Sequence, residues 1–249
     1  MTLRTQPSPT EPTTTTMLRD ALTVLAKDLR IERRSKVTTT QIAPFGVMVL
    51  VLFAFGLDEL VVRGPGESSA NTVSAAAVAA GLFWLATLFA ALLAVQRSSA
   101  LEQADGGRDG LRLSGMDPAG IFLGKSAAVF LQLAVLEVLL AIGVVLLFDA
   151  TLRNPVLLAA TAVPATIVLA TTGTIYATLT GGQRSRDTLV PLLEFPLVAP
   201  ILLAASQATR AALDDRTIDG WPWVRLLVVA ALAFTALGVL LFDAVLEDL

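Results

Sequence analysis

The apolar residues of this chain are gathered into separate runs of about 20, the length that a helix needs to cross the hydrocarbon core of a bilayer. Hydrophobic residues make up 55% of the 249 positions, and the mean hydropathy of +0.72 exceeds the usual balance of soluble proteins. Short segments of alternating hydrophobicity, which are typical of membrane β-barrels, do not stand out. The sequence therefore predicts an all-α polytopic membrane protein.

Six transmembrane helices are predicted from these runs. They cover approximately residues 42–62, 73–95, 119–148, 155–180, 189–209 and 224–242. Residues 1–16 are rich in Pro and Thr and lack the apolar centre of a secretory signal, so we expect a disordered tail followed by one transmembrane domain over residues 17–249.

The segment before the first span has the pattern of an amphipathic helix. Leu18, Leu22, Leu25 and Leu29 recur at steps of four, three and four residues, while charged residues occupy the rest of the segment. Such a helix is too charged to span a bilayer but suits the headgroup plane. We expect an N-terminal interfacial helix; a solvated helix in a cytoplasmic extension is the alternative.

The distribution of positive charge predicts the orientation. With six spans, both termini lie on one side, and that side receives 13 of the 18 lysines and arginines. Positive charge accumulates in the cytoplasmic loops of membrane proteins. The protein is therefore expected in the cell membrane with both termini in the cytoplasm.

One cytoplasmic connection stands out, the polar segment of residues 96–118 between the second and third spans. It holds seven charges of both signs and several glycines that permit tight turns. We expect a short cytoplasmic helix that docks on a partner protein; a loop whose charges only enforce topology is the alternative. Mixed charge fits a protein partner better than nucleic acid or lipid. The candidate contact residues are Glu102, Asp105, Gly106, Gly107, Asp109, Gly110, Leu111 and Leu113.

Polar and helix-breaking residues inside the spans are further candidates. Glu137 lies near the middle of the third span, with Gln132 five residues before it. An acid at that depth is costly and is expected to face the bundle interior or stay protonated, either on a transport path or in a bond between helices. The fifth span carries Pro191, Pro196 and Pro200, which predict a kinked or broken helix, and also Glu194, expected near the inner headgroups.

Several kinds of chemistry are not expected of this chain. It contains neither cysteine nor histidine, so disulfides and the commonest ligands of zinc and haem are missing. The sequence also lacks the phosphate-binding loop of ATPases and the usual hydrolase motifs. We therefore expect a non-catalytic subunit with no catalytic residues, no metal site and no cofactor of its own.

Four stretches, in order, are similar to one family. They are the opening segment 28–34 (DLRIERR), the second span at 81–93 (GLFWLATLFAALL), the polar segment with its Asp-Gly pairs, and the proline-rich run 192–204 (LLEFPLVAPILLA). In these the chain resembles the cytochrome c maturation protein B (CcmB) family, whose members are permease-like subunits of a haem exporter and are similar to type-2 ABC transporter permeases.

The resemblance implies partners and a mechanism. Two copies of the chain would bind two ATP-hydrolysing subunits (CcmA-like) through the polar segment. They would work with a haem-handling membrane protein (CcmC-like), a small membrane subunit (CcmD-like) and a haem chaperone (CcmE-like). ATP would be handled by the ATPase and haem by the complex. The alternatives are a type-2 ABC permease for a lipid or drug, a proton-coupled carrier using Glu137, and a passive scaffold.

Overall fold

The computed structural model describes residues 14–36, 38–61, 75–104, 115–148, 152–180 and 189–247, and every regular element in these ranges is a helix. In chain order the elements are α1 (Thr14–Ser35), the short π-helix η1 (Thr38–Ile42), α2 (Ala43–Val61), α3 (Ala75–Ala104), α5 (Pro118–Phe148), α6 (Pro155–Thr180), α7 (Leu189–Leu213) and α8 (Thr217–Glu247). The predicted tail, residues 1–16, lies almost entirely outside the described residues.

Five of these helices are long and apolar enough to cross a membrane. The qualifying stretches are Ala77–Gln96, Pro118–Phe148, Pro155–Thr178, Pro196–Leu213 and Thr217–Phe242. α1 and α2 qualify as a sixth only when taken together, as a pair bent by 53°. The prediction of an all-α polytopic membrane protein is confirmed, and α2 occupies the position of the first predicted span.

Two helix boundaries differ from the predicted spans. α3 continues to Ala104, because the polar residues after the apolar run are mostly good helix formers such as Ala, Leu, Glu and Gln. α8 starts at Thr217, so only residues 214–216 separate it from α7. In that tight connection the Arg216 amide donates to the Ala211 carbonyl at 2.8 Å.

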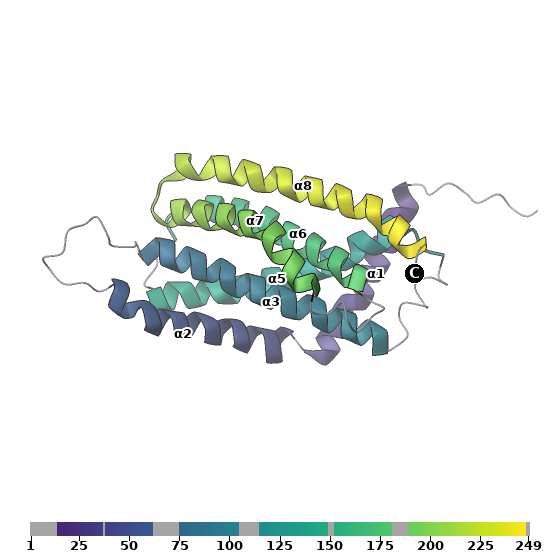
Figure 1. Cartoon of the computed structure of the whole chain (residues 1–249), viewed down its shortest axis with the longest axis horizontal. Coiled ribbons are helices and arrows are strands. Elements are labelled where there is room, and N and C mark those ends of the chain that lie inside the picture. The colour runs from purple at the N-terminus through teal and green to yellow at the C-terminus, as the bar shows by residue number, and fades with distance from the viewer. Residues whose placement is uncertain are drawn as a thin grey trace, which may run out of the picture.

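The helices form one elongated bundle (Figure 1). α6 packs against α3, α5, α7 and α8, while α3 also packs against α2, α5 and α7. α1 crosses one end of the bundle, and the C-terminal end of α8 lies at that same end (Figure 1). The first and last described helices therefore both reach the same end of the bundle.

α1 is held against the start of α5 by a very close backbone approach. A Cβ atom added to Gly124 would lie 2.5 Å from the Ala21 carbonyl oxygen, and one added to Gly120 would lie 2.8 Å from that of Met17. Atoms cannot approach so closely, so only glycine fits at these two positions. Val24 fills the contact, while Leu18 and Leu22 on another side of α1 are exposed. α1 therefore has a protein-facing side and an apolar outer side, as an interfacial helix requires.

The packing of α3 on α6 can be tested by cross-linking, because the chain has no cysteine of its own. A Cβ atom at Gly173 would lie 3.7 Å from the Val95 Cβ, which is close to the spacing in disulfides. We expect the double variant V95C/G173C to lose both reactive thiols on oxidation, as counted by maleimide labelling after denaturation. V95C and G173C alone should keep theirs. Two free thiols in the oxidised double variant would contradict the described α3–α6 packing.

Candidate functional site

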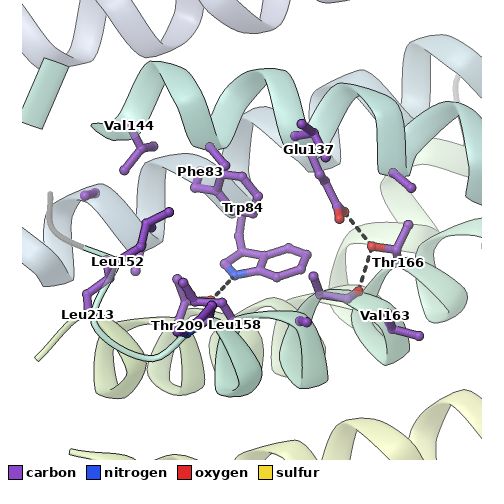
Figure 2. A pocket seen from close by; sticks show the side chains of 18 of the residues that line it. Phe83, Trp84, Glu137, Val144, Leu152, Leu158, Val163, Thr166, Thr209 and Leu213 are labelled. Atoms are coloured by element: carbon purple, nitrogen blue, oxygen red, sulfur yellow. Dashed lines mark hydrogen bonds between the residues drawn. The ribbon is translucent and has the colours of Figure 1, made fainter. Parts of the chain in front are cut away.

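The most unusual feature of the transmembrane bundle is a buried acid on α5. Glu137 is 7% exposed and lies beside Thr166 of α6, with 2.5 Å between the Thr166 Oγ1 and the Glu137 Oε1. The Thr166 hydroxyl also lies 2.7 Å from the carbonyl oxygen of Ala162 in its own helix. Figure 2 shows the two side chains pointing toward one another across the α5–α6 contact.

The number of protons in this small network limits its arrangement. A hydroxyl carries one hydrogen, so Thr166 donates either to Glu137 or to Ala162 at any moment. Both contacts are satisfied together when the Glu137 carboxyl is protonated and donates to Thr166, which then donates to Ala162. Among the described residues no cation contacts the Glu137 carboxyl, and an unpaired buried charge is expensive in this environment, which also favours the neutral acid.

Glu137 borders a cavity of about 390 Å³ between α3, α5, α6 and the end of α7. Its wall is almost wholly apolar, and the Trp84 ring forms a large part of it (Figure 2). The Trp84 indole N–H donates to the Thr209 Oγ1 at 2.9 Å, so that polar group is already satisfied. Glu137, Thr166 and Thr209 are the side chains that bring oxygen atoms to the cavity.

The cavity opens to the side of the bundle. Val138 on α5 and Val163 on α6 line it and are 63% and 48% exposed. Both lie within stretches that qualify as membrane spans. Its opening therefore faces the lipid between α5 and α6, and it extends toward Leu152 and Leu213 at the end of the bundle opposite α1.

The other intramembrane candidates do not join Glu137. Gln132 is half-buried and takes no part in the bonds of Glu137 and Thr166. Pro191 falls in the first turn of α7, where proline is tolerated, and the side chain of Glu194 lies outside the described residues.

The prolines do not break α7. Pro196 and Pro200 lie inside one helix, Leu189–Leu213, and both are exposed instead of turned into the bundle. Figure 1 shows the N-terminal part of α7 turned away from the line of the rest. A bent but continuous helix is possible because each proline removes only one backbone bond.

Only the ends of the polar segment are described. Glu102 falls in the last turn of α3, so residues 96–104 continue that helix and do not belong to a separate short one. The remaining predicted contact residues lie outside the described residues, and their role stays a prediction; they are Asp105, Gly106, Gly107, Asp109, Gly110, Leu111 and Leu113.

The end of the polar segment is tied to α1. The Asp117 Oδ1 accepts the backbone N–H of Ala119 at 2.8 Å and of Gly120 at 3.3 Å, and so caps the start of α5. The backbone N–H of Asp117 in turn donates to the Asp20 Oδ2 on α1 at 3.1 Å. α1, the polar segment and α5 therefore meet at one point.

Sequence reasoning missed two residues of these arrangements, Asp20 and Thr166. Asp20 was counted only among the charges of α1, although it lies on the same side as Val24, away from the leucines. Thr166 is one of several threonines in α6 whose hydroxyls bond to their own helix, as Thr161 does to the Leu157 carbonyl. Only the neighbouring helix distinguishes it.

Comparison with known proteins identifies relatives along almost the whole chain. The sequence model of the family described as CcmB protein matches residues 19–247. The chain is 28% identical over 197 residues to Heme exporter protein B of Rhodobacter capsulatus, covering 79% of this chain and 85% of that protein. It is 28% identical over 191 residues to Heme exporter protein B of Haemophilus influenzae, covering 77% and 81%. For the Pseudomonas aeruginosa protein of the same name the identity is 27% over 217 residues, covering 87% and 92%.

A double-mutant cycle tests the bond between Glu137 and Thr166. We expect a coupling free energy of about 1 kcal/mol between E137L and T166V, because hydrogen bonds between transmembrane helices have about this strength. Reversible unfolding by sodium dodecyl sulfate in mixed micelles would measure it. T161V is the matched control, since Thr161 is equally buried but bonds to its own helix. A coupling no larger than that between E137L and T161V would show that the bond adds nothing to stability.

Proposed function

This chain belongs to the CcmB protein family, and from that membership we propose that it is the membrane subunit of an ABC-type haem exporter used in cytochrome c maturation. The observation that carries the proposal is the family match across residues 19–247, which includes nearly every described helix. The three curated relatives are all named Heme exporter protein B. ATP hydrolysis is assigned to a partner subunit, because the sequence has no phosphate-binding loop.

In this proposal the chain transmits motion from a bound ATPase into the membrane. The polar segment joins α3 to α5, two helices of 30 and 31 residues that are each about 45 Å long. Trp84 on α3 and Glu137 on α5 each lie in the half of the helix that is farther from the polar segment, and both border the same cavity. A displacement of the polar segment would therefore reach the cavity through two continuous helices.

The ATPase contact is assigned to the polar segment. Glu102, Asp105 and Asp109 would supply charge, Leu111 and Leu113 apolar contacts, and Gly106, Gly107 and Gly110 the turns between them. The hydrogen bond from the Asp117 backbone N–H to Asp20 supports this assignment, because it fixes one end of the segment to α1. The ATPase would be CcmA-like, with CcmC-like and CcmD-like membrane subunits, a CcmE-like haem chaperone and two copies of this chain.

The proposed location is the cytoplasmic membrane, with both termini and the polar segment in the cytoplasm. The excess of lysine and arginine on that side supports this orientation. The position of α1 and the end of α8 at one end of the bundle is compatible with it (Figure 1).

The cavity beside Glu137 gives some weight to one rival, a proton-coupled carrier. Such a carrier would transport without any ATPase and would lose activity in E137Q. A type-2 ABC permease for a lipid or drug is the other rival, and it would depend on an ATPase but not on haem-handling partners. Transport assays with and without the CcmA-like subunit separate these functions.

Reversing two charges of the polar segment tests the ATPase contact. We expect D105K/D109K to weaken association with the CcmA-like ATPase at least about tenfold, since like charges at an interface cost several kcal/mol. Co-purification followed by ATPase rates of the isolated complex would measure this. D214K/D219K carries the same change in charge on exposed residues at the opposite end of the bundle and should leave association unchanged. Equal association of the two variants would remove the docking assignment.

Removing the Asp20 carboxylate tests transmission through α1. We expect D20A to leave the ATPase bound but to lower the ATP-dependent activity of the complex severalfold, because the polar segment loses a charge-assisted bond of about 1.5–3 kcal/mol. Release of the haem chaperone per ATP hydrolysed is the quantity to measure. R19A, which alters the neighbouring exposed residue of α1, is the control. Unchanged coupling in D20A would show that α1 takes no part.

A further inference from the structure

The lateral cavity has the size and lining of a ligand site. Its volume of about 390 Å³ falls within the range of small-molecule pockets and exceeds the ~150 Å³ apolar cavities that already bind benzene or xenon. Its lining follows α5 from Phe130 to Val144, which is about 21 Å along the helix axis. An elongated apolar molecule matches that shape.

One polar atom of a side chain that lines the cavity has no partner among the described residues. Thr166 bonds to the Oε1 of Glu137, and the Oε2 has no hydrogen-bond partner among the described residues. The Oε2 is not among the fully buried polar atoms that lack a partner, so part of its surface is accessible. The Glu137 side chain lines the cavity and is 93% buried. When the Oε1 carries the proton that satisfies Thr166, the Oε2 is a carbonyl-type acceptor that lacks a donor.

The polar group of the ligand must therefore donate a hydrogen bond. The acceptor lies deep in the span and the remaining walls are apolar, so the ligand needs one donor and a hydrocarbon body. A cation is not required, because the protonated acid presents no charge. The side opening between Val138 and Val163 admits molecules that are dissolved in the bilayer.

We propose that this cavity is a binding site for a neutral amphipathic molecule that enters from the lipid, donates an O–H or N–H to the Glu137 Oε2 and lays its hydrocarbon body against Trp84. A membrane lipid held only by its acyl chain fits less well, because it would leave the buried acceptor without a donor. The proposal goes beyond haem export and does not depend on it.

Tryptophan fluorescence reads this site directly. The chain has three tryptophans, and the variant W221F/W223F leaves Trp84 in the cavity wall as the only one. The full-length protein in lipid nanodiscs would be titrated with 10-bromodecan-1-ol, whose bromine quenches a tryptophan on contact. 1-Bromodecane is the matched probe without a donor, and 10-bromodecylamine is the matched cation.

The proposal expects saturable quenching by the bromoalcohol and only linear, partition-like quenching by the bromoalkane. In the same tryptophan background E137Q should bind the alcohol within about twofold of the parent, because glutamine keeps the acceptor oxygen and can donate to Thr166. E137L should weaken binding of the alcohol at least about fivefold, because it removes the hydrogen bond to the ligand.

Two further variants guard against misfolding of E137L. A141L narrows the cavity while keeping the acid, and it should also weaken binding of the alcohol, whereas V135L on the exposed side of α5 should not. Equal quenching by alcohol and alkane, or unchanged affinity in both E137L and A141L, would overturn the site. Tighter binding of the amine than of the alcohol, together with loss of this binding in E137Q, would overturn the proposal that the ligand is neutral.

Discussion

The close approach of helices at small residues is the interaction on which this structure depends. A bilayer is as apolar as the helices themselves, so burial of apolar side chains gives little drive for association, and packing must supply it. The described core accordingly has many alanines where helices meet, among them Ala86, Ala90, Ala204 and Ala205. At Gly120 and Gly124 the approach is closer still, and it fixes α1 across the end of α5.

Two buried polar groups of the described bundle are paired across helices, whereas most buried threonines bond to their own helix. The Trp84 indole has Thr209, and the Glu137 Oε1 has Thr166. In lipid an unpaired polar group cannot turn to water, so each such group constrains which helices meet and in what register. The Oε2 of Glu137 has no such partner among the described residues, and Glu137 lines the lateral cavity.

The spans could be predicted from the sequence because their signal is local: about 20 apolar residues have no alternative but to cross the bilayer. The cap at Asp117 and Pro118 was predictable for the same reason, since it depends on neighbouring residues alone. The partner of Glu137 was not, because every threonine of α6 looks alike until α5 is placed beside it. The cavity could not be predicted either, since it arises where alanines of α3, α5 and α6 leave space that no side chain fills. The extension of α3 to Ala104 was missed because the apolar run ends near residue 95, whereas the residues after it still favour a helix.

The helix cap at Asp117 and the buried acid Glu137 belong to the same helix, α5. α5 begins at the Asp117 cap, where α1 and the polar segment meet, and it carries Glu137 about five turns further on. Between these points it packs against α1, α3, α6 and α8, so it cannot shift without changing the walls of the cavity. In the proposed function, an ATPase that moved the polar segment would therefore act on the cavity through a rigid element, against whose start α1 is packed. Conversely, a ligand held between Glu137 and Trp84 would join α5 to α3, the two helices that the polar segment connects. Any resistance it offered to their relative motion would then be transmitted to the proposed ATPase contact.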